Sequence, residues 1–168
     1  FEASLVPENH RQAIAAFMAP IRVKHYPTYE HSIRVGLLAR QIGIFMHLDP
    51  KALLFAGLLH DVGKAQTNMA TLAKTEGWNA DDTKEIKHHV MDGYRLVRGR
   101  FDFSAEIILW HHRFQWDGYP RRLPKHLHDF SLGTELMISL NGRFVSLSDT
   151  FDALHRINDK HGVLEALT

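Results

Sequence analysis

Residues 49–64 of the chain read DPKALLFAGLLHDVGK and decide its fold. Asp49 is a favourable N-cap residue and Pro50 fits the first turn of a helix, so the stretch predicts a helix that begins here. The apolar run Ala52–Leu59 is far shorter than the ~20 residues that cross a bilayer. We therefore expect a buried core helix that places His60 and Asp61 at its end, where both side chains can reach a common ion.

Apolar residues elsewhere also recur at helical spacing, and strand-like alternation is weak. Helices are expected over Glu8–Met18, Glu30–Met46, 52–63 and Ser139–Leu154, with two more capped by Asp81 or Asp82 and by Ser104. The connection from Gly118 to Gly133 is too irregular to assign. The pattern predicts an all-α fold, a single compact bundle of about six to eight helices over residues 1–168, with an N-terminal helix in 1–20 and a core in 26–154.

The composition excludes several classes of protein. The chain has 168 residues and no cysteine, which excludes a disulfide scaffold and any cysteine-ligated zinc or iron–sulfur site. With 20 Lys and Arg against 19 Asp and Glu, the net charge of +1 offers no chain-wide field for a nucleic-acid duplex or an anionic bilayer. We expect a cytoplasmic protein without a membrane span. Because the chain opens at Phe1 without an initiator Met and without a targeting pattern, we expect a trimmed fragment of a larger protein or a processed product.

Histidine is abundant, with 13 of the 168 residues, and several histidines stand beside aspartate or beside each other. A carboxylate that follows an apolar run, as Asp61 does, is costly to bury unless a cation meets it. Imidazole and carboxylate without thiolate favour Fe, Mn, Co, Ni or Zn over Ca or Mg. Seven candidate metal ligands are spread over five predicted helices: His31, His60, Asp61, His89, His111, His112 and Asp149.

Seven ligands exceed what one ion usually takes from a protein while it keeps an open position. Two ions bridged by a carboxylate would use all of them, and such a pair, about 3.5 to 4 Å apart, supports phosphoester hydrolysis. Each residue alone also has a structural interpretation. His31 could cap a helix, and Asp149 could cap a turn. Lys64, which follows Asp61 and is not among the ligand candidates, could compensate the C-terminus of a helix. The core in 26–154 is thus predicted to bind metal.

Six ordered segments between about Tyr26 and Leu154 carry a family resemblance. They read EHSIRV at 30–35, HDVGK at 60–64, EIKHH at 85–89 with Gly93, IILWHH at 107–112, WDGYP at 116–120 and SDTFDAL at 148–154. The second resembles the HDxGK motif of the HD superfamily of metal-dependent phosphohydrolases. Together the segments resemble its HD-GYP branch, the cyclic di-GMP phosphodiesterases of bacteria.

The resemblance implies a role for each ligand. One ion would be held by His31, His60, Asp61 and Asp149, and the other by His89, His111 and His112, with Asp61 bridging. Lys64 would face a substrate phosphate as a point charge, so Asp61 and Lys64 are the predicted catalytic residues. The ions implied are divalent Fe or Mn, with Ni, Co or Zn as alternatives. The implied reaction is attack of a metal-bridging hydroxide on phosphorus, which gives the linear dinucleotide.

The loop after the paired histidines departs from the family pattern. Arg113 stands where the family has Glu, an extra residue precedes Trp116, and the second Gly of the motif is missing. Pro27 stands where some members carry a Glu that binds a third metal, so we expect two ions. Arg113, Arg121 and Arg122 are candidates to bind a substrate phosphate or an acidic partner surface. A solvated basic loop is the structural alternative.

Three functions follow from these observations. The first is a two-metal phosphodiesterase acting on a cyclic dinucleotide, cyclic di-GMP before others. The second is a nucleotidase or other phosphohydrolase of the wider superfamily, acting on another nucleotide. The third is a catalytically silent signalling module whose altered loop binds a partner protein. The presence of all seven ligand-type residues argues against the third, because buried polar groups that only a cation satisfies are costly.

Overall fold

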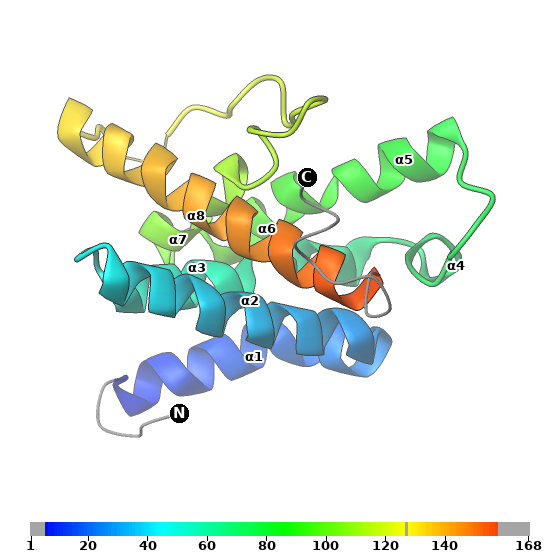
Figure 1. Ribbon diagram of the computed structural model, residues 1–168, viewed down its shortest axis with the longest axis horizontal. Coiled ribbons are helices and arrows are strands. Elements are labelled where there is room, and N and C mark those ends of the chain that lie inside the picture. The colour runs from blue at the N-terminus through cyan, green and yellow to red at the C-terminus, as the bar shows by residue number, and fades with distance from the viewer. Residues whose placement is uncertain (1–5, 127, 158–168) are drawn as a thin grey trace.

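The computed structural model describes residues 6–126 and 128–157, which form helices joined by loops (Figure 1). The elements in chain order are α1 (Glu8–Lys24), α2 (Tyr26–Phe45), α3 (Pro50–Leu59), the 3-10 helix η1 (Val62–Gln66), α4 (Met69–Leu72), α5 (Ala80–Lys87), α6 (His89–Val97), α7 (Asp102–Trp110) and α8 (Leu132–Ile157). No strand occurs among the described residues, so the predicted all-α fold is confirmed. None of their helices is long and apolar enough to span a membrane.

Helix α3 lies at the centre of the bundle, in contact with α1, α2, α7 and α8. It begins as predicted, because the Asp49 carboxylate accepts hydrogen bonds from two backbone N–H groups of the first turn at 2.9 and 3.2 Å. Every residue of Leu53–Leu59 is buried. The helix supplies side chains to both hydrophobic clusters found among the described residues, as expected for a helix that is apolar all round.

A short 3-10 helix follows α3, and Gly63 in it allows a close approach to α6. Helix α3 ends at Leu59 rather than near Gly63, and η1 follows. A Cβ atom on Gly63 would lie 1.9 Å from the carbonyl oxygen of His89 and 2.5 Å from the backbone nitrogen of Gly93. The backbones of η1 and α6 are therefore in direct contact. Gly93 lies on the α6 side of this contact, where a Cβ atom would lie 3.5 Å from the backbone nitrogen of Gly63.

Helix α1 continues through Pro20 to Lys24, although the sequence predicts a stop after Met18. Proline removes a backbone hydrogen bond and disfavours the interior of a helix. The following turn is retained because Ile21 is fully buried and because the Lys24 ammonium donates to the carbonyl oxygen of Ala65 at 2.8 Å. Burial and a long-range hydrogen bond thus outweigh the local signal.

Two predicted N-caps are wrong. Asn79 caps α5: its side-chain oxygen accepts from the backbone N–H of Asp82 at 2.9 Å, and the Asp82 carboxylate accepts from the backbone N–H of Asn79 at 3.0 Å. This reciprocal capping box leaves neither Asp81 nor Asp82 as the cap. Ser104 is buried inside α7, which begins two residues earlier at Asp102.

Helices α2 and α8 are longer than predicted, and they lie side by side (Figure 1). Helix α2 begins at Tyr26 rather than Glu30, with Pro27 in its first turn, where a missing N–H costs nothing. Helix α8 begins at Leu132 rather than Ser139, and the Ser131 hydroxyl accepts from a backbone N–H of its first turn at 3.2 Å. The connection predicted to be irregular from Gly118 to Gly133 contains no helix in its described residues up to Ser131, and its last two residues already belong to α8.

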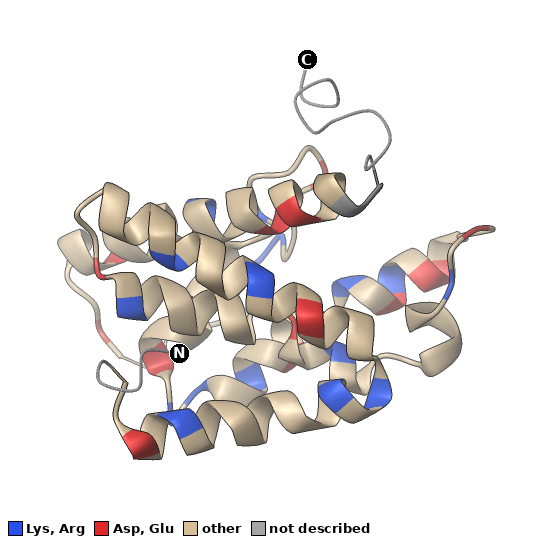
Figure 2. Cartoon of the chain, turned by 60° about the horizontal axis from the view of Figure 1, so that its bottom comes forward, with Lys and Arg blue, Asp and Glu red and all other residues tan. Residues whose placement is uncertain are grey.

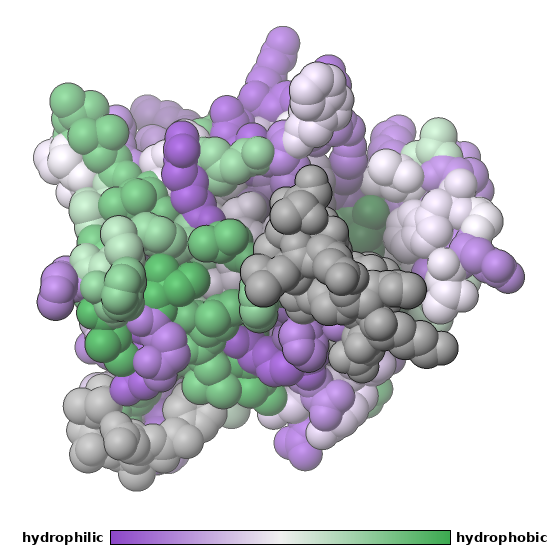
Figure 3. Space-filling model, in the orientation of Figure 1, coloured by the Kyte–Doolittle hydropathy of each residue, from purple (hydrophilic) through white to green (hydrophobic). Residues whose placement is uncertain are grey.

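The surface of the described residues combines dispersed charge with an apolar area. Basic and acidic residues are interspersed along the helices in the view of Figure 2. Leu132, Leu136 and Leu140, one turn apart on α8, are exposed, as are Ile44 and Phe45 at the end of α2. Figure 3 shows apolar surface on the side where α8 begins and α2 ends. Exposed apolar patches commonly mark contacts with other proteins or domains.

Candidate metal centre

The structure brings the seven candidate ligands into one cluster where five segments of the chain meet. They are His31 in the second turn of α2, His60 and Asp61 in the turn after α3, His89 at the start of α6, His111 and His112 directly after α7, and Asp149 in α8. Six of them are buried, and the side chain of Asp149 is 14% exposed.

One group of ligand atoms comes from α2, the α3–η1 turn and α8. The Nε2 atom of His31 lies 3.0 Å from Oδ1 of Asp149 and 3.8 Å from Oδ2 of Asp61. The Nε2 atom of His60 lies 3.5 Å from the same Oδ2 of Asp61. Ligand atoms of His31, His60 and Asp61 all lie within 4.8 Å of one another, a spacing that a single ion could bridge.

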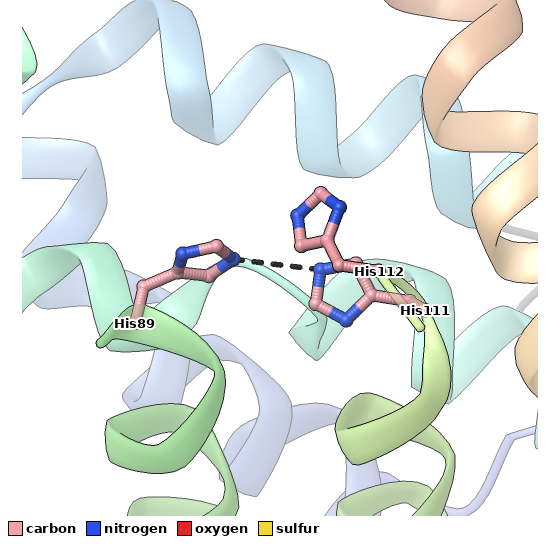
Figure 4. Close-up of side chains that lie close together, drawn as sticks. All are labelled: His89, His111 and His112. Carbon is pink, nitrogen blue, oxygen red and sulfur yellow. Dashed lines mark hydrogen bonds between the residues drawn. The ribbon is translucent and has the colours of Figure 1, made fainter. Parts of the chain in front are cut away.

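A second group consists of three imidazoles. His89 approaches from α6 and His111 and His112 from the end of α7, and the three rings converge in Figure 4. The Nε2 atoms of His89 and His111 are 3.4 Å apart, and ligand atoms of all three histidines lie within 4.8 Å of one another. Oδ1 of Asp61 lies 3.3 Å from Nε2 of His89. The two oxygens of Asp61 therefore face different groups.

Three histidines are oriented by the backbone of the helical turn before them. The Nδ1 atoms of His60, His89 and His111 each lie within hydrogen-bond distance of the carbonyl oxygen three residues earlier, at 2.7, 2.5 and 2.6 Å. A carbonyl can only accept, so the proton of each neutral ring lies on Nδ1. The last carbonyls of a helix lack partners within it. Helix ends thus hold these rings with the Nε2 lone pair directed into the cluster.

Burial keeps most of the imidazoles neutral. It lowers the pKa of His60 and holds that of His111 well below its usual range. It also lowers the pKa of His89 to about 3 and that of His112 to about 4. The imidazoles near one another add to this effect at His111, because neighbouring positive charges would repel. Neutral imidazole is the form that binds a metal ion.

The acidic side of the cluster behaves differently. Burial opposes ionisation of Asp61, but Lys64 and then His60 hold the pKa of this carboxyl well below its usual range. Burial also disfavours a charge on His31, but its hydrogen bond with Asp149 and the charge of Asp61 raise the pKa of this imidazole above its ordinary value. This side of the cluster thus favours charge, with an ionised Asp61 and a His31 ring that holds a proton more readily than an ordinary histidine, whereas the pKa of each of the other four imidazoles is lowered.

Several polar atoms of the cluster are buried without a hydrogen-bond partner: Nε2 of His60, Oδ1 of Asp61 and Nδ1 of His112. Burying such atoms unpaired is costly. His89 cannot donate a hydrogen bond to Oδ1 of Asp61, because its proton lies on Nδ1 and the nearby Nε2 atom is itself an acceptor. Divalent cations would satisfy these acceptors, and the nitrogen and oxygen donor set suits transition metals. The residues therefore fit metal ions.

The same residues lie within a recognised family domain. The family model described as "HD domain" matches residues 28–154 of the chain. The chain belongs to the HD-domain family. Members of this family are metal-dependent phosphohydrolases, which agrees with the donor set of the cluster. The resemblance to the HD superfamily and to its HD-GYP branch is confirmed.

Relatives of this HD domain carry names of cyclic-dinucleotide enzymes. It is 31% identical over 136 residues to the cyclic di-GMP phosphodiesterase of Thermotoga maritima, covering 76% of this chain and 34% of the relative. It is 34% identical over 158 residues to the cyclic di-GMP phosphodiesterase response regulator RpfG of Xanthomonas campestris, covering 89% and 39%. It is 29% identical over 159 residues to the 3'3'-cGAMP-specific phosphodiesterase 1 of Vibrio cholerae, covering 89% and 34%. The chain thus spans between a third and two fifths of the length of these relatives.

A solved structure shares the fold. The HD domain of the phosphodiesterase PgpH from L. monocytogenes superposes with a TM-score of 0.60 at 18% sequence identity, covering 83% of this chain and 73% of that chain. At this identity the similarity concerns the fold, and it agrees with the helical arrangement described above.

The basic side chains predicted to bind substrate differ in their surroundings. Nζ of Lys64 lies 2.6 Å from Oδ2 of Asp61, and the Lys64 side chain is 20% exposed, so its ammonium stands between the cluster and solvent. Arg113 instead donates to the carbonyl oxygen of Pro120 and lies 5.0 Å from the centre of the Trp110 ring, so it braces the loop.

The other two loop arginines are far more accessible. The side chain of Arg121 is 86% exposed, and Nη2 lies 3.4 Å from Oδ1 of Asp117. Arg122 is also exposed. Contact of Arg113, Arg121 or Arg122 with a substrate stays a prediction.

Sequence analysis missed three residues around the ligands. Asp152 accepts a hydrogen bond from Nδ1 of His31 at 2.7 Å, and Arg34 donates to Asp152. The Tyr119 ring stacks on His112 with 4.6 Å between ring centres. The spacing of Asp152, three residues after Asp149 on one helix, is a signal that could have found it. Tyr119 lies in the WDGYP segment, but its contact with His112 depends on the path of an irregular loop.

Proposed function

We propose that this HD domain hydrolyses a phosphodiester bond of a cyclic dinucleotide with the help of two divalent transition-metal ions. The observation that carries the proposal is the placement of Asp61, whose two oxygens face two separate groups of ligand atoms. A carboxylate so placed suits two neighbouring ions better than one. Cyclic di-GMP is the first substrate to test, since relatives from Thermotoga and Xanthomonas are named for it.

The division of ligands follows the two groups. His31, His60, Asp61 and Asp149 would hold one ion, and His89, His111 and His112 would hold the other, with Asp61 shared. Fe or Mn is proposed for both positions, with Ni, Co or Zn as alternatives. When bound, such a pair lowers the pKa of a coordinated water and neutralises charge on a phosphate.

The chain itself supplies orientation and charge. Backbone carbonyls hold the rings of His60, His89 and His111 in place, so little rearrangement is needed when ions enter. Lys64 would bind a non-bridging phosphate oxygen of the substrate, because its side chain is partly exposed and its ammonium lies next to Asp61. Developing negative charge on phosphorus-bound oxygens is stabilised most by donors that are already positioned.

The proposed function is tested by product analysis. Protein loaded with Fe²⁺ or Mn²⁺ without oxygen is incubated with cyclic di-GMP, 3'3'-cGAMP and a set of mononucleotides, with a chelator-treated sample as control. Linear dinucleotide formed only by the metal-loaded protein is the expected result. Free phosphate from a mononucleotide alone would favour the wider class of nucleotide phosphohydrolases. Two bound ions without any product would favour a silent signalling module.

Lys64→Met should slow turnover of the cyclic dinucleotide by about 100-fold, because one positioned charge at the developing phosphate charge is lost. Metal content should stay the same, since Lys64 is not a ligand. Steady-state kinetics and elemental analysis of the same preparation measure both effects. The matched control is Lys51→Met, which removes an exposed lysine at the start of α3. A turnover rate within twofold of the parent protein would reduce Lys64 to a structural counter-ion of Asp61.

A further inference from the structure

His31 differs from the other oriented imidazoles because of where it lies. His60 and His111 follow the ends of helices, where backbone carbonyls lack partners, whereas His31 lies inside α2, where the backbone carbonyls are used by the helix. Its Nδ1 atom therefore needs a side-chain acceptor. Oδ2 of Asp152, 121 residues further along the chain, accepts from it at 2.7 Å.

Asp152 is in turn held by Arg34. Nε of Arg34 donates to Oδ1 of Asp152 at 2.6 Å, and Nη2 donates to Oδ2 at 3.1 Å. This two-point contact fixes the plane of the carboxylate as well as its position. The side chain of Asp152 is 11% exposed and that of Arg34 is 43% exposed, so the pair lies between the buried cluster and solvent.

Helices α2 and α8 each contribute one ligand candidate and one residue of the supporting ion pair. Arg34 stands three residues after His31 on α2, and Asp152 three residues after Asp149 on α8, so each pair occupies one face of its helix. The inner members, His31 and Asp149, approach within 3.0 Å, and the outer members form the ion pair. The orientation of His31 is thereby set by residues of both helices.

We propose that Asp152, held by Arg34, is a positioning residue: it keeps Nδ1 of His31 as a hydrogen-bond donor, so that Nε2, which faces Asp61 and Asp149, is the atom that a metal ion would bind. The inference rests on the proposed metal assignment. An anionic hydrogen-bond partner makes a ligand imidazole a stronger donor to a metal than a neutral carbonyl does. His89 and His111 have carbonyl partners.

Charge adds to this asymmetry between the two metal positions. Asp149 and the shared Asp61 face the group of His31, and Asp152 stands behind that group. The group of His89, His111 and His112 faces only the shared Asp61 among the described carboxylates within salt-bridge distance. The position that contains His31 therefore binds a divalent cation more tightly than the three-histidine position, and loss of Asp152 weakens the tighter one.

The test is calorimetric titration of metal-free protein with Mn²⁺. Asp152→Ala should weaken one of the two binding steps by about 10- to 100-fold and leave the other within about threefold. Asp152→Asn should weaken the same step less, because the amide oxygen still accepts from Nδ1. Arg34→Lys should fall between the parent and Asp152→Asn, since a single ammonium cannot make the two-point contact.

A second measurement does not depend on bound metal. The ring-nitrogen NMR shifts of His31 in metal-free protein report which nitrogen carries the proton. Nδ1 of the parent should carry a proton next to Asp152, whereas in Asp152→Ala the neutral ring should carry its proton on Nε2, next to Asp149. A role limited to tying α2 to α8 would leave Nδ1 protonated in the folded Asp152→Ala variant, whose helix content is checked by circular dichroism.

The matched control is Asp102→Asn, which alters another histidine–aspartate pair. Oδ2 of Asp102 lies 2.9 Å from Nε2 of His128, outside the cluster, so both Mn²⁺ affinities should be unchanged. Equal weakening of both steps by Asp152→Ala, or no weakening of either, would overturn the inference. If the parent binds two ions but hydrolyses no nucleotide, the proposed function fails, while the affinity and tautomer measurements still decide the role of Asp152.

Discussion

Asp61→Asn should abolish hydrolysis of the cyclic dinucleotide, with a fall in turnover on the order of 10³-fold or more. The reason is that both carboxylate oxygens are used: Oδ2 faces His31 and His60, and Oδ1 faces His89. An asparagine keeps one acceptor oxygen and places an NH₂ group against the other set of ligands. At least one of two bound ions should be lost, which elemental analysis of purified protein measures together with turnover.

The control for this substitution is Asp92→Asn. Asp92 pairs with Arg95 at 3.3 Å near the surface, and its loss should leave metal content and turnover unchanged. Exchange of a carboxylate for an amide is the same chemical change in both variants, so a difference between them reflects position. Retention of both ions at parental affinity in Asp61→Asn would show that the carboxylate is not shared between two metals.

Local signals account for the parts of the fold that the sequence could predict. The start of α3 follows from Asp49 and Pro50, and the side chain of Asp49 caps that helix as expected. Ser104 carries the same kind of signal, yet it is buried inside α7. A serine that could cap a helix can equally well lie within one, and packing of the apolar face decides between the two.

In the cluster, too, short contiguous motifs could be predicted from the sequence, whereas contacts between distant residues could not. Ordered motifs identified the seven ligand candidates, because each motif is short and contiguous. The support around them is different: Asp152 reaches His31 across 121 residues, and three rings are oriented by backbone carbonyls that every residue possesses. Arg113 was a candidate for substrate binding, and its contact with Pro120 depends on the path of an irregular loop. Such contacts leave no periodic pattern in a single sequence.

The fold and the cluster depend on each other most directly where η1 crosses α6. Gly63 lies between Asp61 and Lys64 on one side of this contact, and His89 lies on the other. Gly63→Ala should lower the free energy of unfolding by about 3 kcal/mol or more. The new Cβ would lie 1.9 Å from the carbonyl oxygen of His89 and 2.5 Å from the backbone nitrogen of Gly93, and neither backbone atom can rotate away.

The affinity for Mn²⁺ should also fall in Gly63→Ala. Relief of the clash moves η1 away from α6 and so separates Asp61 from His89. Urea unfolding of metal-free protein measures the loss of stability, and Mn²⁺ titration measures the weakened site. Gly133→Ala is the matched control, because the nearest atom to its Cβ is Oγ of Ser131 at 3.8 Å, and the change should stay within about 0.5 kcal/mol. If Gly63→Ala unfolds within about 1 kcal/mol of the parent and binds Mn²⁺ equally well, the backbone contact between η1 and α6 does not hold the cluster together.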